Sequence, residues 1–183
     1  MKQVGSPACF SLQKREKTII IDITTVFQEA ITMPIIRHTN SPDAVWTRRP
    51  DHDVHDFEKI ELFPRTEAKG CYANLIKLPP KKAGFPYHYH SINEECFFIL
   101  NGRGLLRTPE GEQEVTSGDS IFFPTGETGA HQLTNLSETE PLLYLDFDTF
   151  HYPEVCFYPD SGKVGIFGEN MKQVYYLKDQ TTY

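Results

Sequence analysis

Short apolar runs that alternate with turn residues fill residues 71–147, and this pattern constrains the fold more than any other feature of the sequence. The spacing between the runs is typical of strands in a sandwich or barrel. The chain also contains 13 Phe and 9 Tyr, and aromatic residues favour strands. We therefore predict an all-β barrel or jelly roll with strands at 72–78, 96–100, 105–108, 113–116, 120–123 and 142–147.

Length and charge exclude several classes of partner. A chain of 183 residues suits one domain, and it can bury a core without disulfides or structural metals. Its 18 basic and 25 acidic residues give a net charge of −7, which argues against a surface that neutralises nucleic-acid phosphates. No stretch approaches the roughly 20 apolar residues that span a membrane. We expect a soluble cytoplasmic protein without a nucleic-acid or membrane partner.

The ends of the chain differ from its centre. Residues 1–32 match the rest poorly, and we expect them to form either an added strand or a loose extension, with Met33 as the alternative start of the folded protein. Residues 33–183 are then a single domain whose barrel core is about 71–147. The flanking segments 46–63 and 150–177 are long enough to cover a sheet edge or to exchange with a partner, so we predict a homodimer.

Several cysteines and histidines have ordinary structural interpretations. The four cysteines are scattered, and none forms a Cys-x-x-Cys pair of the kind found in zinc ribbons or redox sites. Cys96 lies in an apolar run, and we predict that it is a small buried hydrophobic residue. His52 and His55 lie in a charge-rich polar segment, which predicts a solvated loop.

A separate group of polar residues has the spacing of metal ligands. His88 and His90 are two residues apart in an extended segment, so their side chains point to the same face. Glu94 or Glu95, after a short turn, can add an oxygen from the next strand. His131 begins a later strand after a turn rich in Gly and Pro. Three imidazoles and one carboxylate leave two positions open on a six-coordinate metal.

The residues around these histidines resemble the two motifs of the cupin superfamily. The first motif corresponds to His88, His90, Glu95 and the closing Gly102, and the second corresponds to Gly118, Pro124, Gly126, His131 and Asn135. The gap between Gly126 and His131 is two residues longer than the family pattern, which predicts a longer turn before the last ligand. Further matches, in 90–95, 126–132 and 158–164, resemble a bacterial single-domain subfamily named after sugar-phosphate isomerases.

The resemblance implies a double-stranded β-helix barrel that holds one divalent metal ion through His88, His90, Glu95 and His131. Glu95 is favoured over Glu94 because the family counts back from the closing glycine and because Phe97 and Ile99 then share its inward parity. Mixed nitrogen and oxygen ligands suit manganese, iron, nickel and zinc alike.

The implied activity is the isomerisation or epimerisation of a small polar metabolite, such as a sugar or sugar phosphate. An iron-dependent dioxygenase and a non-catalytic binding module are the alternatives. Isomerisation needs a general base, for which Glu94, Tyr144 and His151 are candidates. Residues 158–164 include Lys163 and permit a phosphate site, but Pro159 and the residues after it favour an ordinary turn.

Overall fold

The computed structural model describes residues 34–48, 54–179 and 181. Backbone contacts divide the chain into the units Met1–Pro34 and Ile35–Tyr183, and the fold is that of the second unit. The predicted extension, 1–32, lies outside the described residues, as does His52. Among the described residues, no helix has the length and apolar character needed to cross a bilayer.

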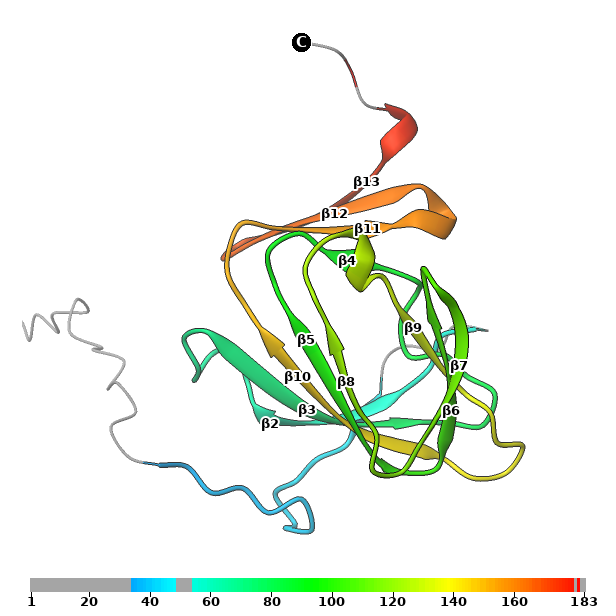
Figure 1. The fold of residues 1–183 in the computed structure, drawn as a ribbon. Helices are drawn as coiled ribbons and strands as arrows, with labels where there is room; N and C mark the ends of the chain where they lie inside the picture. The colour runs from blue at the N-terminus through cyan, green and yellow to red at the C-terminus, as the bar shows by residue number, and fades with distance from the viewer. Residues whose placement is uncertain (1–33, 49–53, 180, 182–183) are drawn as a thin grey trace, which may run out of the picture. The chain divides into compact units, whose positions relative to one another are not determined.

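The second unit consists mainly of antiparallel strands (Figure 1). In chain order these strands are β1 (Thr47–Arg48), β2 (Glu58–Phe63), β3 (Cys71–Leu78), β4 (Tyr89–His90), β5 (Glu95–Asn101), β6 (Arg103–Thr108), β7 (Gly111–Thr116), β8 (Ser120–Phe123), β9 (Gln132–Asn135), β10 (Leu142–Thr149), β11 (Glu154–Tyr158), β12 (Lys163–Gly168) and β13 (Met171–Tyr176). Three short 3₁₀ helices are also described: η2 (Glu127–Gly129), η3 (Pro159–Ser161) and η4 (Leu177–Asp179). All six predicted strands are present, with ends shifted by one or two residues in most cases.

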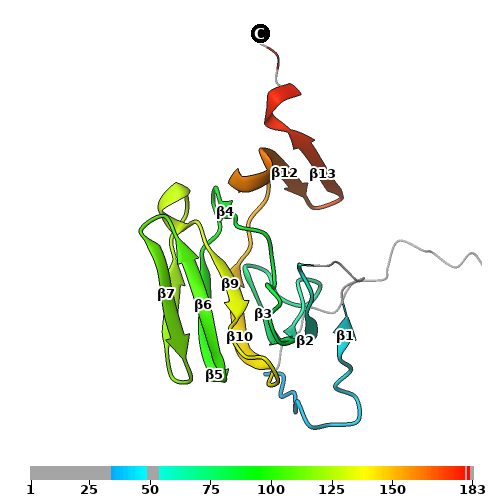
Figure 2. The ribbon, with the colours of Figure 1, turned by 90° about the vertical axis from the view of Figure 1, so that its right-hand side faces the viewer.

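Two sheets form the barrel and enclose its apolar core (Figure 2). The larger sheet has the order β1-β2-β3-β10-β5-β8, and the smaller has the order β7-β6-β9. Alternate residues of these strands point inward, and they pack into one cluster of buried side chains. The cluster consists of Phe57, Ile76, Leu78, Phe97, Ile99, Leu106, Val115, Phe123, Leu133, Leu142 and Tyr144. The prediction of an all-β barrel is confirmed.

The flanking segments add strands on both sides of the predicted barrel core. In the first, β2 pairs along β3 and so covers an edge of the larger sheet. In the second, β11, β12 and β13 join β4 in a separate sheet of order β13-β12-β11-β4, seen at the top of Figure 1. Because β4 carries His90, this third sheet adjoins the predicted ligands.

Two motif residues hold the barrel turns in place. Gly102 has a φ of +93°, and a Cβ atom there would lie 3.1 Å from the Cα atom of Leu142, so a larger residue would be strained and crowded. The buried side-chain amide of Asn135 donates hydrogen bonds to the carbonyl oxygens of Leu78, Pro79 and Glu140. These two motif positions therefore have structural roles.

The segment that contains His55 differs from the prediction of a solvated loop. His55 is half-buried, and Asp56 is only 2% exposed. Asp56 is buried because Arg48 forms an ion pair with it, with 2.5 Å between Nη2 and Oδ2.

The prediction for Cys96 is also wrong in degree. Cys96 is half-buried because it lies on the outward face of β5, opposite in parity to Glu95.

Candidate metal centre

The backbone brings the first and last predicted ligands together. His88 and His131 form an isolated antiparallel bridge, in which each backbone N–H donates to the other residue's carbonyl, at 3.1 and 2.9 Å. The helix η2 occupies the longer turn that the sequence predicted before His131. This pairing places the two imidazole rings with their centroids 4.6 Å apart.

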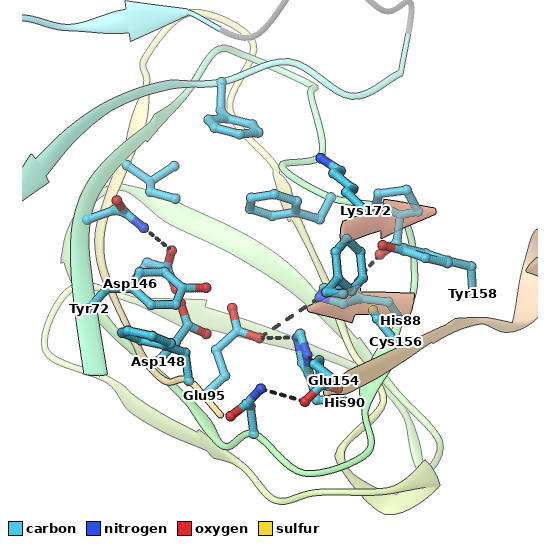
Figure 3. A pocket seen from close by; sticks show the side chains of 18 of the residues that line it. Tyr72, His88, His90, Glu95, Asp146, Asp148, Glu154, Cys156, Tyr158 and Lys172 are labelled. Atoms are coloured by element: carbon cyan, nitrogen blue, oxygen red, sulfur yellow. Dashed lines mark hydrogen bonds and ion pairs between the residues drawn. The ribbon is translucent and has the colours of Figure 1, made fainter. Parts of the chain in front are cut away.

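Glu95 lies at the centre of the four predicted residues. Its atom Oε2 is 3.1 Å from Nε2 of His131, 3.5 Å from Nε2 of His90 and 4.0 Å from Nε2 of His88. Figure 3 shows the carboxylate of Glu95 directed toward His88 and His90. The inward parity expected of Glu95, Phe97 and Ile99 is found, and Glu94 is exposed on the other face. The structure therefore brings all four side chains together.

Backbone carbonyls fix the orientation of two of the imidazoles. Nδ1 of His88 lies 2.8 Å from the carbonyl oxygen of Pro86, and Nδ1 of His131 lies 2.9 Å from that of Gly129. A carbonyl oxygen only accepts, so Nδ1 carries a proton in both rings, which leaves Nε2, the atom that faces Glu95, to bind a metal ion. Phe123 stacks on His131 with ring centroids 3.7 Å apart, which further restricts that ring.

A second carboxylate, Glu154, lies behind His90. Nδ1 of His90 is 3.6 Å from Oε1 of Glu154, which comes from β11 in the third sheet. Glu154 is buried, and it accepts hydrogen bonds from the backbone N–H of Ser91 and from the side-chain amide of Asn93. A carboxylate placed behind a ligating histidine orients the ring and makes it a stronger donor.

Burial and neighbouring charges shift the pKa values of these groups in different directions. Burial, reinforced by His131, lowers the pKa of His88 to about 3. Burial also opposes the charged form of His90, but Glu154 and Glu95 outweigh it and raise the pKa of His90 to about 9. For Glu95, burial is outweighed by the histidines, which hold its pKa well below the usual range. An ionised carboxylate is therefore surrounded by imidazoles.

The orphaned polar atoms of the site fit a metal ion. Among the described residues, the buried side-chain atoms without a hydrogen-bond partner include Nδ1 of His90, Oε2 of Glu95 and Nε2 of His131. Ligand atoms of His88, Glu95 and His131 lie within 4.8 Å of one another. Unpaired buried polar atoms are costly, and one cation would satisfy Oε2 of Glu95 and Nε2 of His131, while Nδ1 of His90 faces Glu154. His/Glu residues are thus positioned to hold a metal.

Cys156 belongs to a neighbouring group that the sequence did not suggest. Its Sγ lies within 4.8 Å of ligand atoms of His88 and His90. Burial raises the pKa of the Cys156 thiol to about 12, so it stays protonated in the metal-free protein. Cys156 comes from β11, outside the two motifs, and only the pairing of β11 with β4 brings it close.

A cavity of about 1340 Å³ extends from the histidines (Figure 3). Strands of the larger sheet and of the third sheet both contribute to its walls, and Lys163 and Lys172 line it from β12 and β13. Sequence reasoning missed the acidic residues Asp146 and Asp148 on its wall. Their signal was present in the sequence, since they continue the inward alternation of β10 beyond Tyr144.

The other sequence candidates have different positions. None of the three candidate bases, Glu94, Tyr144 and His151, is among the residues that line the cavity. Tyr144 is buried in the core because it has the inward parity of β10, while Glu94 and His151 are exposed. Residues 159–161 form η3 and Gly162 is left-handed, so the predicted turn is present before Lys163.

Comparison with known proteins identifies the central part of the chain. The cupin domain family matches residues 74–148. An uncharacterised protein, MJ1618, from Methanocaldococcus jannaschii is 43% identical over 37 residues, which are 20% of this chain and 30% of that protein. The match thus spans less than a third of that relative's length.

Solved structures share the fold at low sequence identity. A sugar phosphate isomerase from a cupin superfamily, from Silicibacter pomeroyi, has a TM-score of 0.63 and 21% identity, with 69% of this chain and 80% of that chain covered. A predicted oxalate decarboxylase from Thermotoga maritima has a TM-score of 0.53 and 21% identity, with 64% and 100% covered. At this level of identity the similarity establishes the fold alone, and differently named proteins share that fold.

Proposed function

We propose that this chain, as a member of the cupin superfamily, is a metal-dependent enzyme acting on a small polar metabolite. The premise is the match of residues 74–148 to the cupin domain and the double-stranded β-helix barrel that they form. The leading reaction is the isomerisation or epimerisation of a sugar or sugar phosphate. The observation that carries the proposal is the convergence of His88, His90, Glu95 and His131, with the first three of these residues at the wall of a large cavity.

The four residues would hold one divalent ion, of manganese, iron, nickel or zinc. Such an ion supplies a Lewis acid that stabilises negative charge on a substrate oxygen. The chain's own residues contribute the orientation of the donors. Backbone carbonyls hold His88 and His131, and Glu154 supports His90.

The cavity supports a polar and anionic substrate. Lys163 and Lys172 line it from the third sheet, so a phosphate group would meet positive charge there. Tyr158 lines the same wall with its ring centroid 6.1 Å from that of His88. Its hydroxyl is a candidate for proton transfer to or from a substrate bound in the cavity.

Turnover of defined compounds tests the proposal. Protein stripped of metal and reloaded separately with Mn²⁺, Fe²⁺, Ni²⁺ or Zn²⁺ is mixed with a panel of sugars and sugar phosphates in D₂O. NMR then follows both new products and exchange of carbon-bound protons. We expect exchange or isomerisation with at least one pair of metal and substrate, and none with the His131→Gln variant.

The alternatives give other results in the same experiment. Saturable binding of a compound without turnover under any metal favours a binding module. Oxygen consumption that requires Fe²⁺ and a substrate favours a dioxygenase. Either result, without isomerisation, contradicts the proposed reaction.

A further inference from the structure

A group of acidic side chains lies beside Glu95, on the side away from the histidines (Figure 3). Asp146 and Asp148 alternate along β10, so both point inward with Tyr144. Glu95, Asp146 and Asp148 are each no more than 4% exposed. One oxygen atom from each of these three residues lies within 4.8 Å of the other two. Three acidic side chains therefore meet inside the barrel.

Strand register makes this contact unavoidable. Asp148 is directly opposite Glu95 in the β10–β5 pair, and β10 also pairs with β3, where Asp146 is opposite Asn74. Like charges directly opposite each other destabilise a sheet, and burial strengthens their repulsion. The repulsion is relieved only if the carboxyls are protonated or a cation lies between them.

An unpaired atom points to a ligand. Oδ2 of Asp146 accepts a hydrogen bond of 3.0 Å from the side-chain amide of Asn74, but Oδ1 of Asp146 has no hydrogen-bond partner. Oε2 of Glu95 faces the histidines and belongs to their site, so Oδ1 of Asp146, whose residue is 3% exposed, is the unpaired atom of the acidic group. A buried carboxylate oxygen without a donor is rare in a folded protein, because its desolvation is not repaid.

We propose that Glu95, Asp146 and Asp148 form a second cation site, separate from the histidine cluster and sharing Glu95 with it. Oxygen-only donors with several negative charges select a hard divalent cation such as Mg²⁺, Ca²⁺ or Mn²⁺. The histidine side offers imidazole nitrogens and so suits softer ions as well. The inference goes beyond the proposed function, since it requires no substrate and no turnover.

Protons are the rival occupant of this cluster. Burial and the charge of Glu95 raise the pKa values of Asp146 and Asp148, so in the metal-free protein these carboxyls compete for protons. A cation displaces such protons because it satisfies several oxygens at once. If a cation occupies the cluster, the chain binds one more metal ion than it does if protons occupy it.

Metal counting tests the proposal directly. The full chain is stripped with chelator, and binding of Mn²⁺ is measured by equilibrium dialysis and electron paramagnetic resonance at neutral pH. We expect two Mn²⁺ per chain in the wild type, with a resonance spectrum broadened by spin coupling between neighbouring ions.

Variants on each side of Glu95 assign the ions. The double variant Asp146→Asn/Asp148→Asn keeps the side-chain volumes and is expected to bind one Mn²⁺ with an uncoupled six-line spectrum. His131→Gln is expected to lose the other ion and to keep the one at the aspartates. Asp179→Asn, on the exposed helix η4, is the matched control and should bind two. Circular dichroism and thermal melting of each variant establish that it is folded.

Three results would overturn the inference. The wild type binds no Mn²⁺ that the folded double variant loses, or the folded double variant still binds two, or the wild type shows two ions without any coupling. In the first case protons neutralise the aspartates, and in the other two the second ion lies elsewhere. None of these results bears on whether the histidine side supports turnover, so failure here is distinguishable from failure of the proposed function.

Discussion

On strands β5 and β10, acidic residues lie on the face that points into the barrel, and large apolar residues lie on the face that points out of it. The inward face carries the buried carboxylates of Glu95, Asp146 and Asp148, whereas the outward face carries Phe98 and Phe147, which are 42% and 38% exposed. Buried charge and exposed large apolar groups are the two departures from ordinary packing that carry information. Both faces of these strands therefore depart from ordinary packing.

On the inward face, the acidic residues are confined to one end of the strands. Farther along the same inward face, Ile99 and Leu142 are fully buried in the apolar core. A single strand thus supplies both the core and the candidate site, because alternation is retained while the residue type changes. The rigid apolar end holds the polar end in position.

The largest effect is expected from removing a histidine ligand. His131→Gln keeps the side-chain size but removes the nitrogen aimed at Glu95, so the affinity for Zn²⁺ should fall by more than about 100-fold, beyond what loss of an orienting group costs. Competition with a chromophoric chelator measures this affinity. His38→Gln, at an exposed position, is the control. An equal affinity in the two variants would exclude His131 as a ligand.

A smaller loss is expected when the support behind His90 is removed. Glu154→Gln takes away the charge beside Nδ1 of His90, so metal affinity should fall by about 10- to 100-fold, the usual effect of an orienting carboxylate. The same competition assay applies. Glu94→Gln is the matched control, because Glu94 is exposed. If Glu154→Gln binds as tightly as Glu94→Gln, the third sheet does not support the site.

The outward face tests the predicted homodimer. Phe98 and Phe122 lie on neighbouring strands of this face and are 42% and 56% exposed. Replacing both with serine should weaken self-association by at least about tenfold, since buried aromatic anchors dominate interfaces. Light scattering over a concentration series measures the change. A wild type that is monomeric at micromolar concentration would contradict the predicted dimer.

The smallest effect is expected at a buried carboxylate that already has its own cation. Hydrogen bonds from Arg48 hold the pKa of Asp56 below its usual value, against the effect of burial. This stabilisation is present above the ordinary aspartate pKa of about 4 and is lost as pH falls through the lower folded-state pKa. Asp56→Asn should therefore cost only about 1 kcal/mol at pH 7, because Arg48 is largely exposed.

Unfolding in urea at several pH values measures this contribution. The difference between the wild type and Asp56→Asn should shrink as pH falls below about 4. A difference that stays constant down to pH 2 would show that the ion pair does not stabilise the fold. Unlike the contribution of Asp56, the contribution of Asp146 to stability is expected to depend on added cations.

The local pattern was sufficient for the barrel strands, and the motif resemblance added the four candidate ligands. Alternation placed Glu95 on the same face as Phe97 and Ile99, and the structure confirms that parity. The third sheet was not predicted, because its pairing joins β4 to β11, about 65 residues later, and no local signal encodes that distance. Glu154 was missed for the same reason.

The sequence by itself determined which segments are strands and which face of each strand turns inward, because these properties depend on neighbours one to a few residues apart, while the resemblance of its motifs to a known family implied the four candidate ligands. Only the tertiary structure decided that Asp148 lies opposite Glu95, that Glu154 lies behind His90 and that Asp56 is paired while Oδ1 of Asp146 is not. Those contacts depend on strand register and sheet order, which the whole chain selects together through the packing of its core.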